Sequence, residues 1–199
     1  MNRLHRLSSH LRRDREGAAL VEFALVAPVL LLMLLGMFDM GYNYYVQSQL
    51  QGAIQKAARD SGIEGAHARM PQIDARVTRA VRALVPDAEI DFSRKAYASF
   101  TDVARPEDFS DIDGNGICSG GEPFEDTNGN NIWDEDRGSE GLGGARDAVL
   151  YVVTVSYRRP FGVTGFIGLP ETFTTHATTV LRNQPYGDQD YSQSVGNCA

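Results

Sequence analysis

The sequence predicts an α+β protein: a long N-terminal helix that enters a membrane, then a small domain with a second helix and an antiparallel sheet. The helix is predicted by residues 18–38, an apolar run of 21 residues with a single charge, because about 20 apolar residues span a bilayer. The sheet is predicted by period-two patterns late in the chain. A third observation, an Asp- and Asn-rich motif that occurs twice between the strands, predicts an acidic insert of turns.

A basic segment precedes the apolar run. Five arginines lie at positions 3, 6, 12, 13 and 15, and such charge stays in the cytoplasm, so the remainder of the chain is expected to be exported. A secretory signal peptide is one alternative, but its apolar core is usually ~7–15 residues and ends in a small-x-small site, which this run lacks. An ordinary signal anchor is another alternative. It leaves Glu22 unexplained, and an acid inside a membrane span needs an explanation because it is costly and usually functional.

The position of Glu22 relative to Gly17 is typical of a type IV pilin-like leader. In that class a peptidase cuts after a glycine on the cytoplasmic side, and a glutamate stands fifth in the processed chain. Cleavage between Gly17 and Ala18 makes Glu22 the fifth residue. The free amine of Ala18 would then pair with Glu22 of a neighbouring subunit, which neutralises a charge in a low-dielectric core and sets the axial register of a filament.

The stretch from Gly17 to Pro28, Gly-Ala-Ala-Leu-Val-Glu-Phe-Ala-Leu-Val-Ala-Pro, resembles the TadE-like family, pilin-like proteins of the bacterial tight-adherence (Flp) type IV pilus system. Residues 12–62 follow the family pattern throughout. The resemblance implies processing by a prepilin peptidase, a small pilin-like exported domain, and a role in pilus assembly or cell adhesion. The implied partners are other pilin-like subunits, the pilus assembly platform and the inner membrane.

Four segments are expected along the chain. They are the basic leader peptide at 1–17, the transmembrane and extended helix at 18–62, the exported α+β domain at 63–185 with its insert at 111–136, and a flexible tail at 186–199. The long helix keeps an amphipathic pattern to about Asp60, and Pro28 should kink it mildly. A second helix is predicted from Pro71 to Leu84, with Pro71 in its first turn. Strands are predicted at 90–92, 96–100, 148–157 and 172–181.

The insert contains a pattern typical of the twelve-residue EF-hand calcium loop. Such a loop offers side-chain oxygens at positions 1, 3, 5 and 9, a backbone carbonyl at 7, a glycine at 6 and a bidentate glutamate at 12. The predicted ligands of this first loop are Asp111, Asp113, Asn115, Ile117, Ser119 and Glu122.

The pattern returns 15 residues later as a second loop. Its predicted ligands are Asp126, Asn128, Asn130, Ile132 and Asp134. Asn131 replaces the glycine, and Asn tolerates the left-handed backbone needed there. Arg137 stands where the closing carboxylate belongs, so Glu135 or Asp136 would have to substitute. We expect one or two structural Ca²⁺ ions, which would neutralise the clustered acids and order the insert; a disordered acidic loop is the alternative.

Composition and cysteine usage agree with an exported protein. The net charge of −7 argues against a nucleic-acid partner. Residues 102–147 hold 13 acids and three arginines, a balance of −10, so the remainder of the chain carries +3. Cys118 and Cys198 are a candidate disulfide, with two free thiols as the alternative. The four histidines are scattered and no constellation meets the requirements of an active site, so an enzyme is not expected.

Two functions remain open. The first is a minor pilin-like subunit, a pseudopilin, that helps to assemble a tight-adherence-type pilus and attach the cell to a surface. The second is a membrane-anchored, calcium-binding exported module that does not enter a filament. Both place the chain in the bacterial inner membrane, with the N-terminus in the cytoplasm and the C-terminal domain in the periplasm or at the cell surface. Only the first requires cleavage after Gly17.

Overall fold

The structure is a computed structural model, and it describes residues 16–61, 66–162, 164–183 and 194–199. The predicted leader at 1–17 therefore lies outside the described residues up to position 15. The chain divides into two compact units, which we describe separately. The first contains the chain up to Tyr44 together with Arg159–Glu171, and the second contains Tyr45–Arg158 and Thr172–Ala199.

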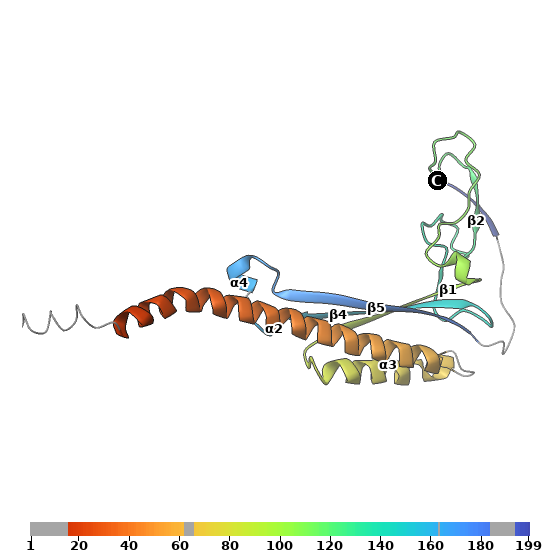
Figure 1. The fold of residues 1–199 in the computed structure, drawn as a ribbon. Coiled ribbons are helices and arrows are strands. Elements are labelled where there is room, and N and C mark those ends of the chain that lie inside the picture. Colours follow the sequence, from red (N-terminus) through yellow and green to blue (C-terminus); the bar gives the residue numbers. More distant parts are fainter. Residues whose placement is uncertain (1–15, 62–65, 163, 184–193) are drawn as a thin grey trace, which may run out of the picture. The chain divides into compact units, whose positions relative to one another are not determined.

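One helix, α2 (Glu16–Ser61), begins in the first unit and ends in the second (Figure 1). It confirms the predicted long helix and continues through Pro28. Within the first unit, its large apolar side chains from Leu20 to Met40 are exposed, as expected of a helix whose partner is lipid or another helix. The remainder of this unit connects two strands, includes the short helix α4 (Thr164–Ile167), and lies against α2.

A four-stranded antiparallel sheet in the order β3-β1-β4-β5 dominates the second unit. Its strands are β1 (Glu89–Tyr97), β3 (Ser139–Glu140), β4 (Ala148–Arg158) and β5 (Thr172–Arg182). The β4 and β5 strands confirm the predictions at 148–157 and 172–181, and they pair along their whole length. Alternate residues of β4 are buried, which is the pattern of a strand with one covered face. The separate strands predicted at 90–92 and 96–100 are instead the single strand β1, and Phe100 belongs to a 3₁₀ turn, η1 (Phe100–Asp102).

Two helical segments supply most of the remaining core of this unit. The C-terminal part of α2 buries Val46, Leu50 and Ile54, and α3 (Ala66–Arg82) buries a stripe at the same spacing, Ile73, Val77 and Val81. Figure 1 shows α3 beside this part of α2, and an ion pair between Asp60 and Arg76, 2.7 Å long, joins the two helices. The prediction that Pro71 stands in the first turn is wrong: α3 begins at Ala66 and contains Pro71, which removes only one helical hydrogen bond.

The insert and the C-terminus form a second, smaller sheet. In it β2 (Pro123–Asp126) pairs antiparallel with β6 (Ser194–Asn197). The flexible tail predicted at 186–199 is therefore wrong for the last six residues, because they add a strand to β2 and bury Cys198. This strand has little apolar pattern of its own, and its partner strand supplies its hydrogen bonds. Residues 184–193 lie outside the described part of the chain.

Candidate metal centre and membrane segment

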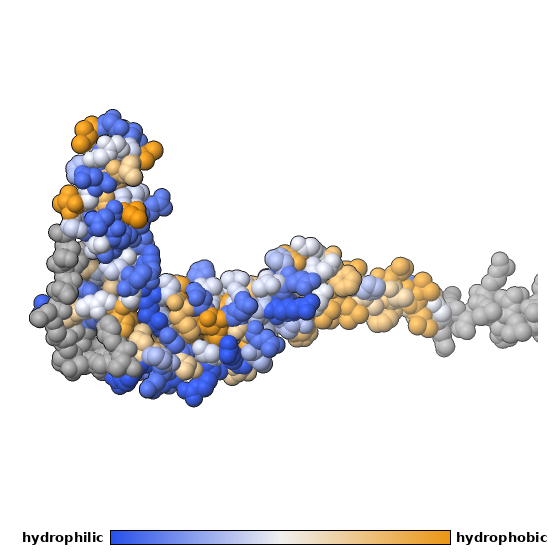
Figure 2. Space-filling view, turned by 180° about the vertical axis from the view of Figure 1, so that it is seen from behind, coloured by the Kyte–Doolittle hydropathy of each residue, from blue (hydrophilic) through white to orange (hydrophobic). Residues whose placement is uncertain are grey.

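The first half of α2 is long and apolar enough to cross a membrane. Figure 2 shows this part of the chain as a continuous apolar surface. This part of the helix includes Gly17, Ala18 and Glu22, and all three residues are exposed. Ala18 and Glu22 are four residues apart and therefore lie on one side of the helix. The helix includes Gly17, so the predicted cleavage point lies in its first turn.

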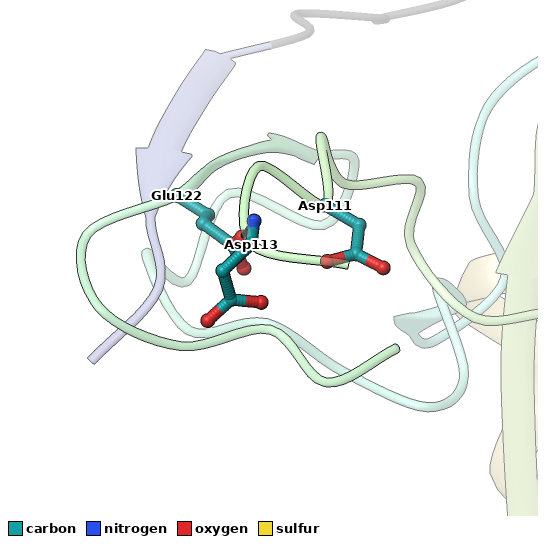
Figure 3. Close-up of side chains that lie close together, drawn as sticks. All are labelled: Asp111, Asp113 and Glu122. Atoms are coloured by element: carbon teal, nitrogen blue, oxygen red, sulfur yellow. Dashed lines mark hydrogen bonds between the residues drawn. The ribbon is translucent and has the colours of Figure 1, made fainter. Parts of the chain in front are cut away.

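Three carboxylates of the first loop lie close together (Figure 3). One oxygen from each of Asp111, Asp113 and Glu122 lies within 4.8 Å of the others, and only Glu122 is buried. The Asp111 carboxylate accepts hydrogen bonds from the N–H groups of Gly114 at 2.7 Å and Gly116 at 2.9 Å. Both glycines have a positive φ, 76° and 74°, which folds the chain back around Asp111. A cation placed among these oxygens would relieve the repulsion of three like charges.

The other predicted ligands of the first loop lie beside this cluster. The Asn115 amide donates to Asp113 Oδ2 at 2.8 Å and approaches Ser119 Oγ at 3.2 Å. Its carbonyl oxygen accepts the N–H of Ile117 at 2.6 Å. Ile117 has a 64% exposed side chain, so only its backbone carbonyl is suited to the ligand role predicted for it.

The second loop repeats the turns of the first with an offset of 15 residues. Asp126 accepts hydrogen bonds from Gly129 at 2.7 Å and Asn131 at 3.0 Å, and Asn130 Oδ1 accepts the N–H of Ile132 at 2.7 Å. Asn131 has a φ of 60°, the left-handed conformation expected at this position. The equivalent residues are Asp111 and Asp126, Gly114 and Gly129, Asn115 and Asn130, Gly116 and Asn131, and Ile117 and Ile132.

The carboxylate that closes the second loop is Glu107, which precedes both loops in the sequence. Its two oxygens accept the N–H groups of Thr127 at 2.7 Å and Asp134 at 3.1 Å. In the first loop, Glu122 accepts the N–H groups of the equivalent residues, Ile112 at 2.6 Å and Ser119 at 3.2 Å. Glu107 is only 1% exposed. The expected substitutes do not take this role: Glu135 is exposed, and Asp136 accepts hydrogen bonds from Lys95 and Tyr97.

If the repeats are counted from Glu107 and Glu122, each loop is closed by the glutamate that begins the other repeat. Between them, the N–H of Ser110 donates to the Pro123 carbonyl at 2.9 Å, and the N–H of Glu125 donates to the Asp108 carbonyl at 2.8 Å. These two bonds are also equivalent at an offset of 15, and they flank an antiparallel bridge between Phe109 and Phe124. The sequence contained the signal, because the pattern Glu-x-Phe-x-Asp begins both at residue 107 and at residue 122. The repeat predicted from the sequence begins at the aspartate and therefore omits Glu107.

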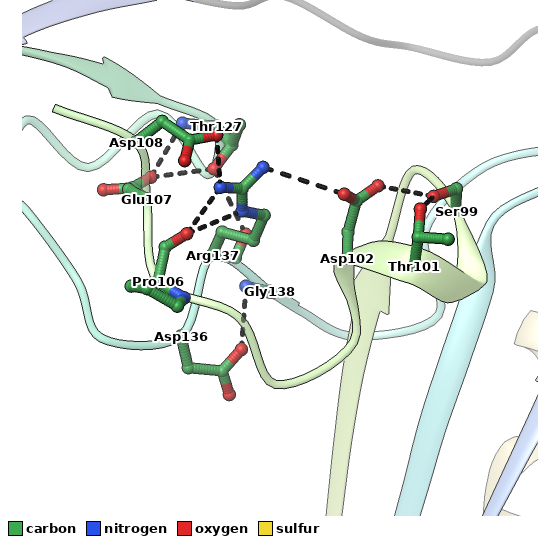
Figure 4. Close-up of polar contacts among 10 residues, drawn as sticks. All are labelled: Ser99, Thr101, Asp102, Pro106, Glu107, Asp108, Thr127, Asp136, Arg137 and Gly138. Atoms are coloured by element: carbon green, nitrogen blue, oxygen red, sulfur yellow. Dashed lines mark hydrogen bonds and ion pairs between the residues drawn. The ribbon is translucent and has the colours of Figure 1, made fainter.

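Arg137 binds the residues on both sides of Glu107, although it occupies the position where the motif expects an acid. Its guanidinium donates to the Pro106 carbonyl at 2.9 Å and 2.5 Å. It also pairs with Asp108 at 2.7 Å and lies 3.7 Å from Asp102 (Figure 4). The bonded groups flank Glu107 on both sides in the sequence. Arg137, which stands where the motif expects the closing acid, therefore positions Glu107, which closes the loop instead.

The centres of the two loops differ in burial and in the number of amides that face their acids. Asp111 is exposed, whereas Asp126 is 0% exposed. Burial by itself raises the pKa of Asp126, but hydrogen bonds from Asn131, Gly129 and Ser194 outweigh it and bring the pKa below its usual value. The amides of Asn128 and Asn130 both donate to Asp134 Oδ2 at 2.7 Å. A cation would have to displace two amide donors in the second loop and one in the first, and the three carboxylates of the first loop lie within 4.8 Å of one another, so the first loop is the stronger candidate centre.

The C-terminal strand fastens both loops. Cys118 of the first loop is disulfide-bonded to Cys198, with 5.3 Å between the Cα atoms. Hydrogen bonds between Cys198 and the Gly121–Glu122 backbone continue the pairing of β6 with β2. The second loop has a weaker attachment, a hydrogen bond of 3.1 Å from Ser194 Oγ to Asp126.

Comparison with known proteins supports the assignment of the N-terminal segment. A family model described as "TadE-like protein" matches residues 17–59, which confirms the resemblance seen in the sequence and relates the chain to the tight-adherence pilus system. No curated protein and no solved structure matches the chain significantly. The matched segment contains Gly17, Ala18 and Glu22 and ends before the sheet and the paired loops.

Proposed function

We propose, from the TadE-like match of residues 17–59, that the chain is a minor pilin-like subunit that helps to assemble a tight-adherence-type pilus and attach the cell to a surface. TadE-like pilus proteins are not known as enzymes, so the role is structural. The observation that carries the proposal is the position of Glu22, an exposed acid in the otherwise apolar segment 18–38 of α2, five residues after Gly17. An unpaired carboxylate there is costly in lipid and requires a partner from another chain.

The exposed apolar surface of α2 supports assembly with other helices. Side chains such as Leu25, Val29 and Met33 are more than half exposed, and none has a partner in the described residues that would cover it. Lipid covers this surface while the subunit is in the membrane. In a filament, equivalent helices of neighbouring subunits would cover it, and the amine of Ala18 would neutralise Glu22.

Processing after Gly17 tests this function and separates it from the alternative. N-terminal sequencing or intact mass of the protein from its native membrane should give a chain that begins at Ala18. The alternative is an anchored module that stays outside the filament, and it predicts an intact leader. Recovery of the uncut chain from cells that contain a prepilin peptidase would reject the proposed function.

Substitution of Glu22 tests the pairing itself. Glu22→Val should leave membrane insertion intact or improve it, because a charge at the centre of a span costs about 2.5–3.5 kcal/mol on insertion scales for comparable residues. Surface attachment and pilus assembly should be lost. Leu20→Val is the matched control, because it changes an exposed apolar residue of the same helix and should retain both. Normal attachment by the Glu22→Val strain would exclude a role for the pairing.

We further propose that the paired loops bind structural Ca²⁺. One ion would be held in the first loop by Asp111, Asp113, Asn115, Ser119, Glu122 and the Ile117 carbonyl. A weaker second ion would be held by Asp126, Asn128, Asn130, Asp134 and the Ile132 carbonyl, with Glu107 as the closing acid. The support is the cluster of three carboxylates within 4.8 Å and the same turn geometry in both loops. Affinities on the order of 10⁻⁴–10⁻³ M are usual for extracellular modules.

Calcium should raise the melting temperature of the full chain in detergent, modestly, as mass action requires for a weak site. The test protein must keep α2, because Val46, Leu50 and Ile54 belong to the core. Glu122→Gln should remove most of the calcium response. Glu125→Gln is the matched control, since Glu125 is exposed on β2 and should not alter it. Equal melting temperatures in calcium and in chelator would reject the metal.

A further inference from the structure

The connection between β4 and β5 is far longer than the pairing of its strands requires. The two strands pair to their ends, at Arg158 and Thr172, so a turn of two to five residues would join them. The chain instead uses the 13 residues 159–171. Charges occur only at the two ends of this connection, and residues 160–170 contain none. Connections between elements of compact domains have a median of about four to six residues, so a connection of this length is uncommon and is usually functional.

The connection lies against α2 just where the apolar run ends. Arg159 forms an ion pair with Asp39, and both side chains are largely buried. The ring of Phe161 lies 6.4 Å from those of Phe38 and Tyr42, centre to centre. Asp39 is the first charged residue after Glu22, so these contacts place the connection at the level where α2 leaves the hydrocarbon layer.

Beyond these contacts the connection turns large apolar side chains outward. Phe166, on α4, is 79% exposed and Leu169 is 47% exposed. Met37 and Met40 of α2, on either side of the ion pair in the sequence, are 66% and 63% exposed. Tyr44, one turn further along, is 70% exposed, and tyrosine is enriched at membrane interfaces. Met37, Met40 and Tyr44 continue the exposed apolar side chains of the membrane segment along α2.

We propose that the β4–β5 connection is a second membrane contact, in which Phe166 and Leu169 enter the interfacial layer of the bilayer beside the end of the α2 span. Lipid is the occupant that the position favours, because α2 already brings residues 38–42 to the membrane boundary. Apolar burial and an aromatic interfacial anchor would then fix the depth of α2, and the Asp39–Arg159 pair would hold the connection to the helix. This inference rests on membrane anchoring and is independent of cleavage after Gly17 and of calcium.

Site-directed spin labelling of the full chain tests this contact. The sequence has two cysteines, both in the disulfide, so Phe166→Cys or Leu169→Cys introduces one free thiol for the label. Phe100→Cys is the matched control, because Phe100 is a 51% exposed phenylalanine in the other unit. The proteins are placed in vesicles of phosphatidylethanolamine and phosphatidylglycerol, and collision rates with oxygen and with a water-soluble nickel chelate are compared.

A label at position 166 or 169 should show an oxygen-to-nickel collision ratio severalfold above that at position 100. The ratio should not change when the protein is diluted with excess lipid. Equal ratios at 166 and 100 would overturn the proposal, because the connection would then lie in water. Protection from both reagents that disappears on dilution would also overturn it, because a second copy of the chain would then be the occupant.

Discussion

The first and second acidic loops have the same backbone turns, but they differ in burial and in the origin of the glutamate that closes each loop. In the first, Asp111 and its neighbours are exposed, and the closing acid Glu122 comes from the end of the same twelve-residue motif. In the second, Asp126 is 0% exposed, and the closing acid Glu107 comes from ahead of the first loop. In the first loop three carboxylates lie close together and one amide donates to Asp113, whereas in the second loop two amides donate to Asp134.

This difference shows how a repeated motif can lack one residue of its pattern and keep its shape. The turns depend on hydrogen bonds that an aspartate accepts from the backbone N–H groups three and five residues later, so each copy folds its own turns. The closing acid acts on backbone groups at positions 2 and 9, and any carboxylate delivered there can serve. Because the copies lie across an antiparallel bridge, each is closed by the glutamate that begins the other repeat.

Removing the disulfide should have the largest effect on stability, and it should destabilise the first loop more than the second. Cys118→Ser with Cys198→Ser should cost about 4 kcal/mol of unfolding free energy, because the bond closes a chain segment with a sequence separation of 80. Hydrogen exchange should increase in the first loop and β6 more than at Gly129 and Asn131. Equal loss of protection in both loops would show that they unfold as one unit.

Glu107→Gln should have the next largest effect, a loss of about 3 kcal/mol of unfolding free energy, since it removes the buried charged acceptor of the Thr127 and Asp134 N–H groups. Glu135→Gln is the control, because Glu135 is exposed, and it should change little. Chemical denaturation measures both. In a double-mutant cycle with Glu122→Gln, the two glutamates should show coupling of about 0.5–3 kcal/mol because the loops share the bridge. A larger effect at Glu135 than at Glu107 would contradict this assignment.

Arg137 gives a test in which the motif and the structure predict opposite results. Arg137→Ala should cost about 2 kcal/mol through the lost charged hydrogen bonds to Pro106 and Asp108. Arg137→Glu restores the acid that the motif expects, yet it should be worse than alanine, because it places a negative charge beside Asp102 and Asp108. A gain in stability or calcium response with Arg137→Glu would show that the second loop prefers closure from its own motif.

The smallest expected effects concern the sixth position of each loop, where φ is positive in both. Asn131→Ala should cost about 1 kcal/mol and Asn131→Gly close to nothing, because alanine resists the left-handed conformation that asparagine and glycine accept. Gly116→Asn and Gly116→Ala should reproduce the same order in the first loop. Melting temperatures of the four variants provide the comparison, and an alanine that costs no more than glycine would contradict the equivalence of the two turns.

The local elements of the fold were predictable because their causes lie within a few residues. Apolar length predicted α2, alternation predicted β4 and β5, and the spacing of Asp, Asn and Gly predicted two turns of one kind. Element boundaries were less predictable at α3, where Pro71 suggested a start but the helix begins at Ala66. The predicted roles of Gly17, Ala18 and Glu22 concern events between chains and stay predictions.

The sequence by itself determined the membrane segment, the helix and strand periods and the geometry of both loops, since helical bonds and turns join residues at most five apart. Only the tertiary structure decided which residues from distant parts of the sequence pair with these helices and loops. Glu107 meets the second loop from 20 residues away, Cys198 reaches Cys118 across 80, and Arg159 reaches Asp39 across 120. Such pairs leave no local pattern, because the free energy that forms them comes from burial and charge pairing once the sheet has brought the segments together.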